Sequence, residues 1–321
     1  MFRRKKNTAM APISNRPTVE WMWQTVSNSS KSSGSIGWTK FSDIENHIIE
    51  DAYAAHKTEV ILDDCRLNLK TRTHISNNNT GTKRSIKRVV LEQNQRPIRE
   101  ERYTFDPIAP LIVELACYGI IYEGKLNERQ HEAEWMATML MTCKYKTIEE
   151  IWICCAYLYT MESFLYKRLN ETMRAIGDNT HEQYWRSKVS TLGPFALLLW
   201  DDPSNIKPKT SKYSLYRGAT LSSEQIAMYK ECCKRPNDYQ SFQAFTSSSR
   251  NRDRAEKFGN ALFTMKVHYA FTADVQMISD YCEEEEELIF PGVCFTVEKF
   301  TYDTKKNKHL IYLKLKQRFN G

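Results

Sequence analysis

The sequence has no apolar run long enough to span a bilayer, and it lacks both a Cys-x-x-Cys motif and histidines at zinc-binding spacing. Its basic start, residues 1–10, is not followed by the apolar segment of a secretory signal. These absences argue against a membrane protein and predict no bound metal. They favour an intracellular location, cytoplasmic or nuclear, in which the nine cysteines are expected to be reduced thiols.

The composition is that of a globular protein with room for two domains. The chain has 321 residues, of which 41% are hydrophobic and 26% charged. The formal net charge is +7, and the basic surplus falls largely in the first hundred residues. That half is expected to prefer anions, although neither a membrane nor a nucleic acid is expected as a partner.

The first part of the chain predicts a small β-rich domain with one helix. Residues 1–16 are basic and interrupted by proline, which is typical of a disordered arm. Residues 19–26 alternate large apolar side chains with others, and Ser42 with Glu45 forms a capping-box pattern at the start of a helix. Three further short strands are expected at residues 59–62, 67–73 and 85–90.

Trp21, Trp38 and Glu50, followed by a basic strand at 84–88, resemble a WWE domain over residues 17–92. The resemblance implies a half-barrel of strands around one helix. Several members of that family bind the iso-ADP-ribose unit of poly(ADP-ribose).

The same resemblance implies that Trp38, His74 and Arg84 are the ligand-binding candidates, with Arg84 able to pair with a phosphate. Cys65 and His74 stand where members that read poly(ADP-ribose) have an aromatic residue and a glutamine. A structural or protein-binding module whose tryptophans are simply core remains the alternative.

Residues 93–110 are charged and rich in proline, which predicts a linker before a second domain at 111–321. Apolar residues then recur at three- and four-residue spacing, which predicts core-facing helices at 111–118, 128–141, 147–159 and 160–176. After the loop at 201–209 the period changes to two. The fold class expected for the whole chain is therefore α+β.

Three motifs in this second domain each adjoin a predicted strand. They are Tyr216-Arg217-Gly218, the serine run Ser247-Ser248-Ser249 after Phe245, and Glu285-Glu286-Glu287 before Leu-Ile-Phe-Pro. In this order they resemble the Arg-Ser-Glu class of mono-ADP-ribosyltransferases, over residues 97–321. The resemblance implies a helical subdomain followed by a β-sandwich core that binds NAD as substrate.

The resemblance also assigns catalytic roles. Cleavage of the nicotinamide–ribose bond passes through an oxocarbenium-like state, which a carboxylate stabilises, and Glu287 is the residue expected to do so. Ser247 would hold that carboxylate, and Arg217 would grip the diphosphate.

The remaining NAD-binding candidates flank these residues. The backbone of Gly218, which lacks a Cβ, would meet the nicotinamide carboxamide, and Phe258 would stack on its ring. Tyr216 and Ser249 complete the predicted set.

A glutamate two positions before the catalytic one is the family pattern for arginine acceptors, which makes Glu285 the predicted acceptor-facing residue. A guanidinium is protonated at physiological pH and needs a carboxylate to orient it and take its proton. On an extended strand Glu285 and Glu287 share a face. Glu283, Glu284 and Glu286 are expected to form a solvated acidic rim.

The sequence therefore predicts an enzyme that transfers ADP-ribose from NAD to protein arginines, targeted by its WWE-like domain to ADP-ribosylated or ubiquitin-system proteins. An NAD glycohydrolase, and a non-catalytic adaptor that only binds ADP-ribose or protein, are the two alternatives.

Overall fold

The computed structural model describes residues 19–25, 37–77, 83–90, 108–280 and 282–317. The chain divides into two compact units, Met1–Glu101 and Arg102–Gly321. The predicted basic arm at 1–16 and most of the predicted linker at 93–110 lie outside the described residues.

The N-terminal unit is a six-stranded antiparallel sheet with one helix, and its strand order is β2-β1-β6-β5-β4-β3. Its elements are β1 (Val19–Thr25), β2 (Gly37–Lys40), α1 (Asp43–Ala54), β3 (Glu59–Ile61), β4 (Cys65–Asn68), β5 (Thr73–Ser76) and β6 (Lys83–Val90). The predicted capping box is confirmed, because the Ser42 hydroxyl and the Glu45 carboxylate each accept the other's backbone N–H.

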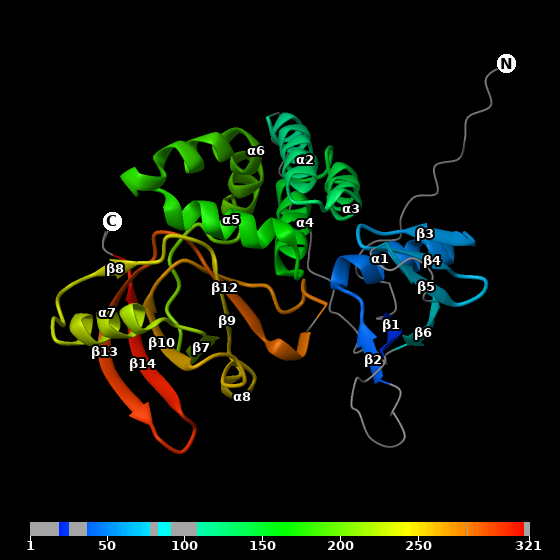
Figure 1. Cartoon of the computed structure of the whole chain (residues 1–321). Helices are drawn as coiled ribbons and strands as arrows, with labels where there is room; N and C mark the ends of the chain where they lie inside the picture. Colours follow the sequence, from blue (N-terminus) through cyan, green and yellow to red (C-terminus); the bar gives the residue numbers. More distant parts are fainter. Residues whose placement is uncertain (1–18, 26–36, 78–82, 91–107, 281, 318–321) are drawn as a thin grey trace. The chain divides into compact units, whose positions relative to one another are not determined.

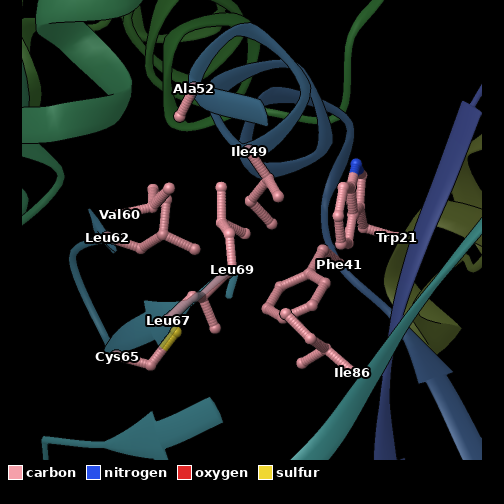
Figure 2. Close-up of a cluster of buried hydrophobic side chains, with 10 residues drawn as sticks. All are labelled: Trp21, Phe41, Ile49, Ala52, Val60, Leu62, Cys65, Leu67, Leu69 and Ile86. Atoms are coloured by element: carbon pink, nitrogen blue, oxygen red, sulfur yellow. The ribbon is translucent and has the colours of Figure 1, made fainter. Parts of the chain in front are cut away.

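The core of this unit lies between α1 and the sheet (Figure 2). Trp21 on β1 is fully buried there, and its indole Nε1 donates to Glu50 Oε2 at 2.9 Å. Arg88 on β6 grips the same carboxylate through Nε at 2.9 Å and Nη2 at 2.7 Å. Burial raises the pKa of Glu50, but the hydrogen bonds from Arg88 and Trp21 outweigh it, so the pKa is lowered. Trp21 and Glu50 thus tie the helix to the sheet.

One predicted strand is wrong in its boundaries. Residues 67–73 were expected to form a single strand, whereas the chain turns between β4 and β5, with Arg72 at a positive φ of 54°. Because a hydrophobic pattern marks the buried side chains and not the turn, it cannot separate two short strands joined so tightly.

The C-terminal unit starts with a layer of helices. These are α2 (Ala109–Leu126), α3 (Gln130–Met141), α4 (Ile148–Thr160), α5 (Phe164–Ala175), the 3-10 turn η2 (Asn179–His181) and α6 (Glu182–Trp200). The four predicted helices are present. Helix α6, which periodicity did not predict, contains Pro194.

The second part of this unit is an eight-stranded sheet with the order β11-β12-β9-β7-β10-β14-β13-β8. Its elements are β7 (Ser214–Ala219), α7 (Ser223–Cys233), β8 (Gln240–Ser241), β9 (Thr246–Ser249), α8 (Arg252–Ala255), β10 (Ala261–Tyr269), β11 (Thr272–Asp274), η3 (Cys282–Glu284), β12 (Glu286–Ile289), β13 (Cys294–Asp303) and β14 (Lys308–Lys316). The strands pair antiparallel except β10 with β14. The expected α+β class is confirmed.

The helices of this unit lie over one side of its strands (Figure 1). Aromatic side chains join these two layers. Tyr159 at the end of α4 packs on Phe245 just before β9, and Phe245 also contacts Trp200 and Phe290. This seam places the ends of α4 and α6 against the residues just before β9 and just after β12, the strands that carry the serine and glutamate motifs. Among the described residues, no helix combines the length and apolar character needed to cross a membrane.

Candidate active site

The acidic run divides at the start of β12. The 3-10 turn ends at Glu284, Glu285 adopts a left-handed backbone with φ of 48°, and the strand begins at Glu286. Glu285 is therefore a turn residue, and the expectation that it lies on an extended strand in phase with Glu287 is wrong. On the strand itself the consecutive residues Glu286 and Glu287 point to opposite faces, and both are buried.

The Glu287 side chain makes its contacts on the face of β12 that points away from Ser247. It pairs in register with Ser248, while Ser247 pairs with Leu288. The Glu287 carboxylate accepts from Thr272 Oγ1 at 2.6 Å and from the Tyr213 hydroxyl at 3.0 Å. Arg250 Nη1 lies 3.5 Å from Oε2 of the same group. The prediction that Ser247 holds the Glu287 carboxylate is therefore contradicted by the strand register.

Glu286 occupies the position that was expected for Glu287. The Ser247 side chain hydrogen-bonds it, and the positive charge of Arg217 acts on it. Burial nevertheless dominates and, with the nearby charge of Glu284, raises the pKa of Glu286 to about 7. A carboxyl group whose pKa lies near neutrality, between a serine and an arginine, has the character of a catalytic group.

Arg217 and Ser247 come together because β7, β9 and β12 are adjacent strands. Arg217 Nη1 donates to the backbone carbonyl of Ser247 at 2.6 Å. Burial lowers the pKa of Arg217, and the positive charge of Arg174 lowers it further. Two guanidinium groups close enough to affect each other electrostatically form an electropositive site that an anion would stabilise.

Helix α5 contributes one face to this site. Tyr166, Asn170 and Arg174 follow one another at four-residue intervals, so they lie on the same side of the helix. Asn170 Nδ2 donates to the Tyr159 hydroxyl at 2.7 Å, and that hydroxyl donates to the Phe245 carbonyl at 3.2 Å. Among the described residues, the buried Asn170 Oδ1 has no hydrogen-bond partner. The amide oxygen is therefore an unsatisfied acceptor beside the site.

The serine run has three different uses. Ser247 faces Glu286, and Ser248 Oγ donates to the Glu287 carbonyl at 2.7 Å. Ser249 Oγ lies 2.5 Å from the Glu284 carbonyl and accepts from the Asn251 backbone N–H at 2.9 Å. Ser249 thus positions the acidic turn, which is a different task from the predicted contact with NAD. Tyr216 follows the strand alternation and lies on the face opposite Arg217, paired with Thr264.

Gly218 is required by packing within the protein. A Cβ at this position would lie 2.1 Å from the Ala255 carbonyl oxygen and 2.8 Å from Phe258 Cβ. The missing side chain therefore admits the turn after α8, and the predicted contact of the Gly218 backbone with nicotinamide stays a prediction. This turn presents the Phe258 ring, which is 59% exposed, next to the strand that carries Arg217.

We expect Gly218→Ala to destabilise the protein by about 2 kcal/mol, because the new methyl group must displace the backbone at 255–258. Gly193→Ala is the matched control, since its Cβ would meet only Val189 Cγ1 at 3.8 Å and alanine favours a helix. Urea denaturation of both variants checks this. Equal stability of the two would contradict the assigned packing.

Comparison with known families decides the relationship. A family model described as NAD:arginine ADP-ribosyltransferase matches residues 123–319, which is more than half of the chain. The chain belongs to this ADP-ribosyltransferase family. A second model, the WWE domain, matches residues 19–88. The predicted relationship is confirmed for both parts of the chain, and with it the use of NAD.

Several solved structures contain chains that are similar to this one. ADP-ribosyltransferase HopU1 of Pseudomonas syringae pv. Tomato is 17% identical, covering 68% of this chain and 100% of its own, with a TM-score of 0.47. The eukaryotic mono-ADP-ribosyltransferase ART2.2 is 17% identical, covering 68% and 91%, with a TM-score of 0.42. Exoenzyme S from Pseudomonas aeruginosa, solved with carba-NAD, is 14% identical, covering 63% and 88%, with a TM-score of 0.43. Comparison with curated protein sequences gives no match.

The WWE domain brings together two of its three ligand candidates. His74 stacks on Trp23 with ring centroids 5.2 Å apart, and the Arg84 guanidinium lies 4.9 Å from the Trp23 ring. Trp38 pairs with Gln24, the neighbour of Trp23 on β1, so it lies on the opposite face.

Cys65 and His74 differ in what they can contribute to this domain. Cys65 is a buried core residue, and burial raises the pKa of its thiol to about 12. The buried His74 Nδ1 has no hydrogen-bond partner among the described residues. Burial and the charge of Arg84 lower the pKa of His74, which favours a neutral ring with a free polar atom.

Sequence reasoning missed several residues of the candidate site in the ADP-ribosyltransferase unit. They are Tyr159, Tyr166, Asn170, Arg174, Glu284 and Glu286. The four-residue spacing on α5 was a usable signal for three of them. For the glutamates there was no equivalent signal, because five identical residues leave the start of the strand undefined by one position.

Proposed function

We propose that this ADP-ribosyltransferase transfers ADP-ribose from NAD to arginine side chains of proteins, with Glu286 as its catalytic carboxylate. The observation that supports this most directly is the meeting of Arg217, Ser247 and Glu286 on adjacent strands, with Glu284 close enough to perturb the Glu286 pKa. Arg217, with Arg174 on α5, supplies the positive charge for the diphosphate.

The chemistry of each group follows from its position. Ionised Glu286 faces the positive charge that develops on the ribose as nicotinamide leaves, and the Ser247 hydroxyl keeps the carboxylate oriented. Glu284 orients the acceptor guanidinium and takes its proton. The exposed Phe258 ring is available to stack on nicotinamide.

Incubation with NAD labelled in its ADP-ribose portion and an arginine-rich acceptor tests this function. Label on the acceptor, removable by arginine-specific cleavage, is the expected result. Free labelled ADP-ribose without modified acceptor would indicate a glycohydrolase. Unchanged NAD would indicate a binding protein without catalysis.

The pH dependence of NAD cleavage should follow the Glu286 carboxyl. Because its pKa is raised to about 7, the active ionised form accumulates as pH rises through neutrality. The value of kcat/KM should therefore rise with a midpoint near 7. Ser247→Ala should move that midpoint upward, since it removes a hydrogen bond that lowers the pKa. Initial rates from about pH 5.5 to about pH 9 measure both; a flat profile would contradict the assignment.

We propose that the WWE domain directs the enzyme to ADP-ribosylated or ubiquitin-system proteins by binding an iso-ADP-ribose unit beside Trp23. The support is the Arg84 guanidinium, which can pair with a phosphate, and an unsatisfied ring nitrogen at His74, both against the Trp23 ring. An intracellular site of action, cytoplasmic or nuclear, completes the proposal, in keeping with buried free thiols such as Cys154 and Cys155.

Titration with iso-ADP-ribose tests the role of this domain. Arg84→Gln should weaken binding by about tenfold or more, because it removes a charge-assisted contact. Lys83→Gln is the control, because Lys83 is exposed and adjacent to Arg84, and the substitution removes one positive charge as Arg84→Gln does. If the two variants bind equally, Arg84 is not a ligand; if the parent protein does not bind, the domain serves protein contacts instead.

A further inference from the structure

A hollow on the face of the eight-stranded sheet opposite Arg217 has the character of an anion site. It has a volume of about 370 Å³ and is lined by Ser211, Lys212, Tyr213, Ser214, Lys266, Val267, His268, Glu298 and Lys314. On β10 the side chains of Thr264 and Lys266 point to the face opposite the buried Met265. Thr264 pairs with Tyr216, so this is the face of the sheet that carries Tyr216, and Arg217 lies on the other face. The hollow opens on the Tyr216 face. It is therefore separate from the candidate active site.

Its lysines are held side by side by the strand register. Lys266 on β10 pairs with Lys314 on β14 in the parallel part of the sheet, and Lys266 also pairs with Ser214 on β7. Two ammonium groups on neighbouring strands and the same face repel each other, which costs stability unless an anion lies between them. This arrangement favours a bound anion over empty solvent.

The hollow has too few carboxylates to neutralise its cations. Glu298 is the acidic residue in its lining, and it lies 3.7 Å from the Lys266 ammonium. Lys314, which is half-buried, and Lys212, which is exposed, have no ion pair among the described residues. Three ammonium groups against one carboxylate leave a net positive site with hydroxyl groups from Ser211 and Ser214 nearby.

The rim of the hollow is fixed by backbone contacts. Ser211 N donates to the Val267 carbonyl at 3.0 Å, and Tyr213 N donates to Ser211 Oγ at 3.1 Å. Lys209 and Ala270 exchange backbone hydrogen bonds at 2.7 and 3.0 Å. Lys212 is thus carried on a loop that is tied to β10 at both sides, so its ammonium starts close to the site before a ligand arrives.

We propose that this hollow binds a phosphate-bearing anion, at a site distinct from that for NAD. A phosphate group offers several acceptor oxygens to ammonium and hydroxyl donors that come from different strands. The volume lies at the lower end of the range for small-molecule sites, which suits a phosphate ester or a diphosphate. Tyr213 places the hollow within one side chain of Glu287, because its hydroxyl donates to that carboxylate at 3.0 Å.

Calorimetric titration of the full chain with inorganic pyrophosphate tests this site. The double variant K266Q/K314Q should lose affinity by about tenfold or more, since each lysine supplies a charge-assisted contact. K305Q, at an exposed lysine in the β13–β14 turn, removes a charge from the same unit and should bind as the parent does. If the double variant fails to fold, the single variant K212Q, on the loop, is titrated in its place, and a smaller loss of pyrophosphate affinity is expected.

The NAD site could also take pyrophosphate, so Arg217→Gln separates the two. Binding that survives Arg217→Gln and falls in K266Q/K314Q is the expected result. Binding that is lost with Arg217→Gln, or that is equal in K266Q/K314Q, K212Q and the parent protein, would overturn the proposal. Neither outcome depends on transfer to arginine, so the site can fail while the proposed function stands.

Discussion

Glu286→Gln is expected to lower both NAD cleavage and transfer by about a thousandfold, because it removes the charge that stabilises the oxocarbenium-like state. The glutamine amide keeps the shape of the side chain, so the loss of activity measures the contribution of the negative charge. Initial rates with labelled NAD measure it. The same change should stabilise the folded protein above pH 7, since the native carboxyl ionises there at a cost of burial.

The sign of this stability effect follows from linkage. The pKa of Glu286 is raised from its ordinary 4.5 to about 7, so the folded state holds the proton more tightly than the unfolded state. Stability of the parent protein therefore falls as pH rises between these values. The advantage of Glu286→Gln should grow over that window and vanish below it, which thermal melting at several pH values can follow.

Glu287→Gln is the matched comparison on the adjacent residue. It weakens the contacts with Thr272, Tyr213 and Arg250, so we expect a loss of about 2 kcal/mol in stability. Activity of the folded protein should fall by less than about tenfold, because the carboxylate faces away from Ser247. If Glu287→Gln were inactive and Glu286→Gln active, the assignment of the two glutamates would have to be reversed.

Glu284→Gln is expected to abolish transfer to arginine while NAD cleavage continues. The amide cannot take a proton from the acceptor guanidinium, so water becomes the remaining acceptor, and free ADP-ribose should replace modified protein. Transfer is expected to fall by about a hundredfold or more. The ratio of acceptor label to free ADP-ribose measures this change directly.

The removal of a neighbouring negative charge gives this variant a second readout. The charge of Glu284 raises the pKa of Glu286, so the midpoint of the NAD cleavage profile should move to lower pH in Glu284→Gln. Glu283→Gln is the control, because Glu283 is exposed within the same turn. Parallel loss of transfer and cleavage in Glu284→Gln would show that the two glutamates do not divide the reaction.

Most of the fold could be predicted from local patterns. The helix at Asp43–Ala54 follows from its capping box, and the strands at the arginine and serine motifs follow from short β-type runs between turns. Helix α6 was missed because Pro194 and a long polar first half hide its apolar face.

The candidate site was predicted in type but not in register. The structure brings together Arg217 and Ser247, which were both predicted site residues, but the glutamate beside Ser247 is Glu286 and not the predicted Glu287. The one-position choice depends on the left-handed turn at Glu285, and nothing in a run of identical residues signals where that turn lies. A one-residue shift in a strand moves each side chain to the opposite face of the sheet. An error of one position therefore changes which glutamate faces Ser247.

The hydrogen bonds that run from Asn170 through the Tyr159 hydroxyl to the Phe245 carbonyl have a consequence for motion. They are buried and lie within an aromatic seam, so α5 and β9 cannot separate without losing both the bonds and the packing. The backbone positions from which Arg174 and Arg217 extend are therefore fixed before NAD binds. Capture of NAD should resemble the docking of a rigid receptor, in which closure of the two layers contributes no slow step.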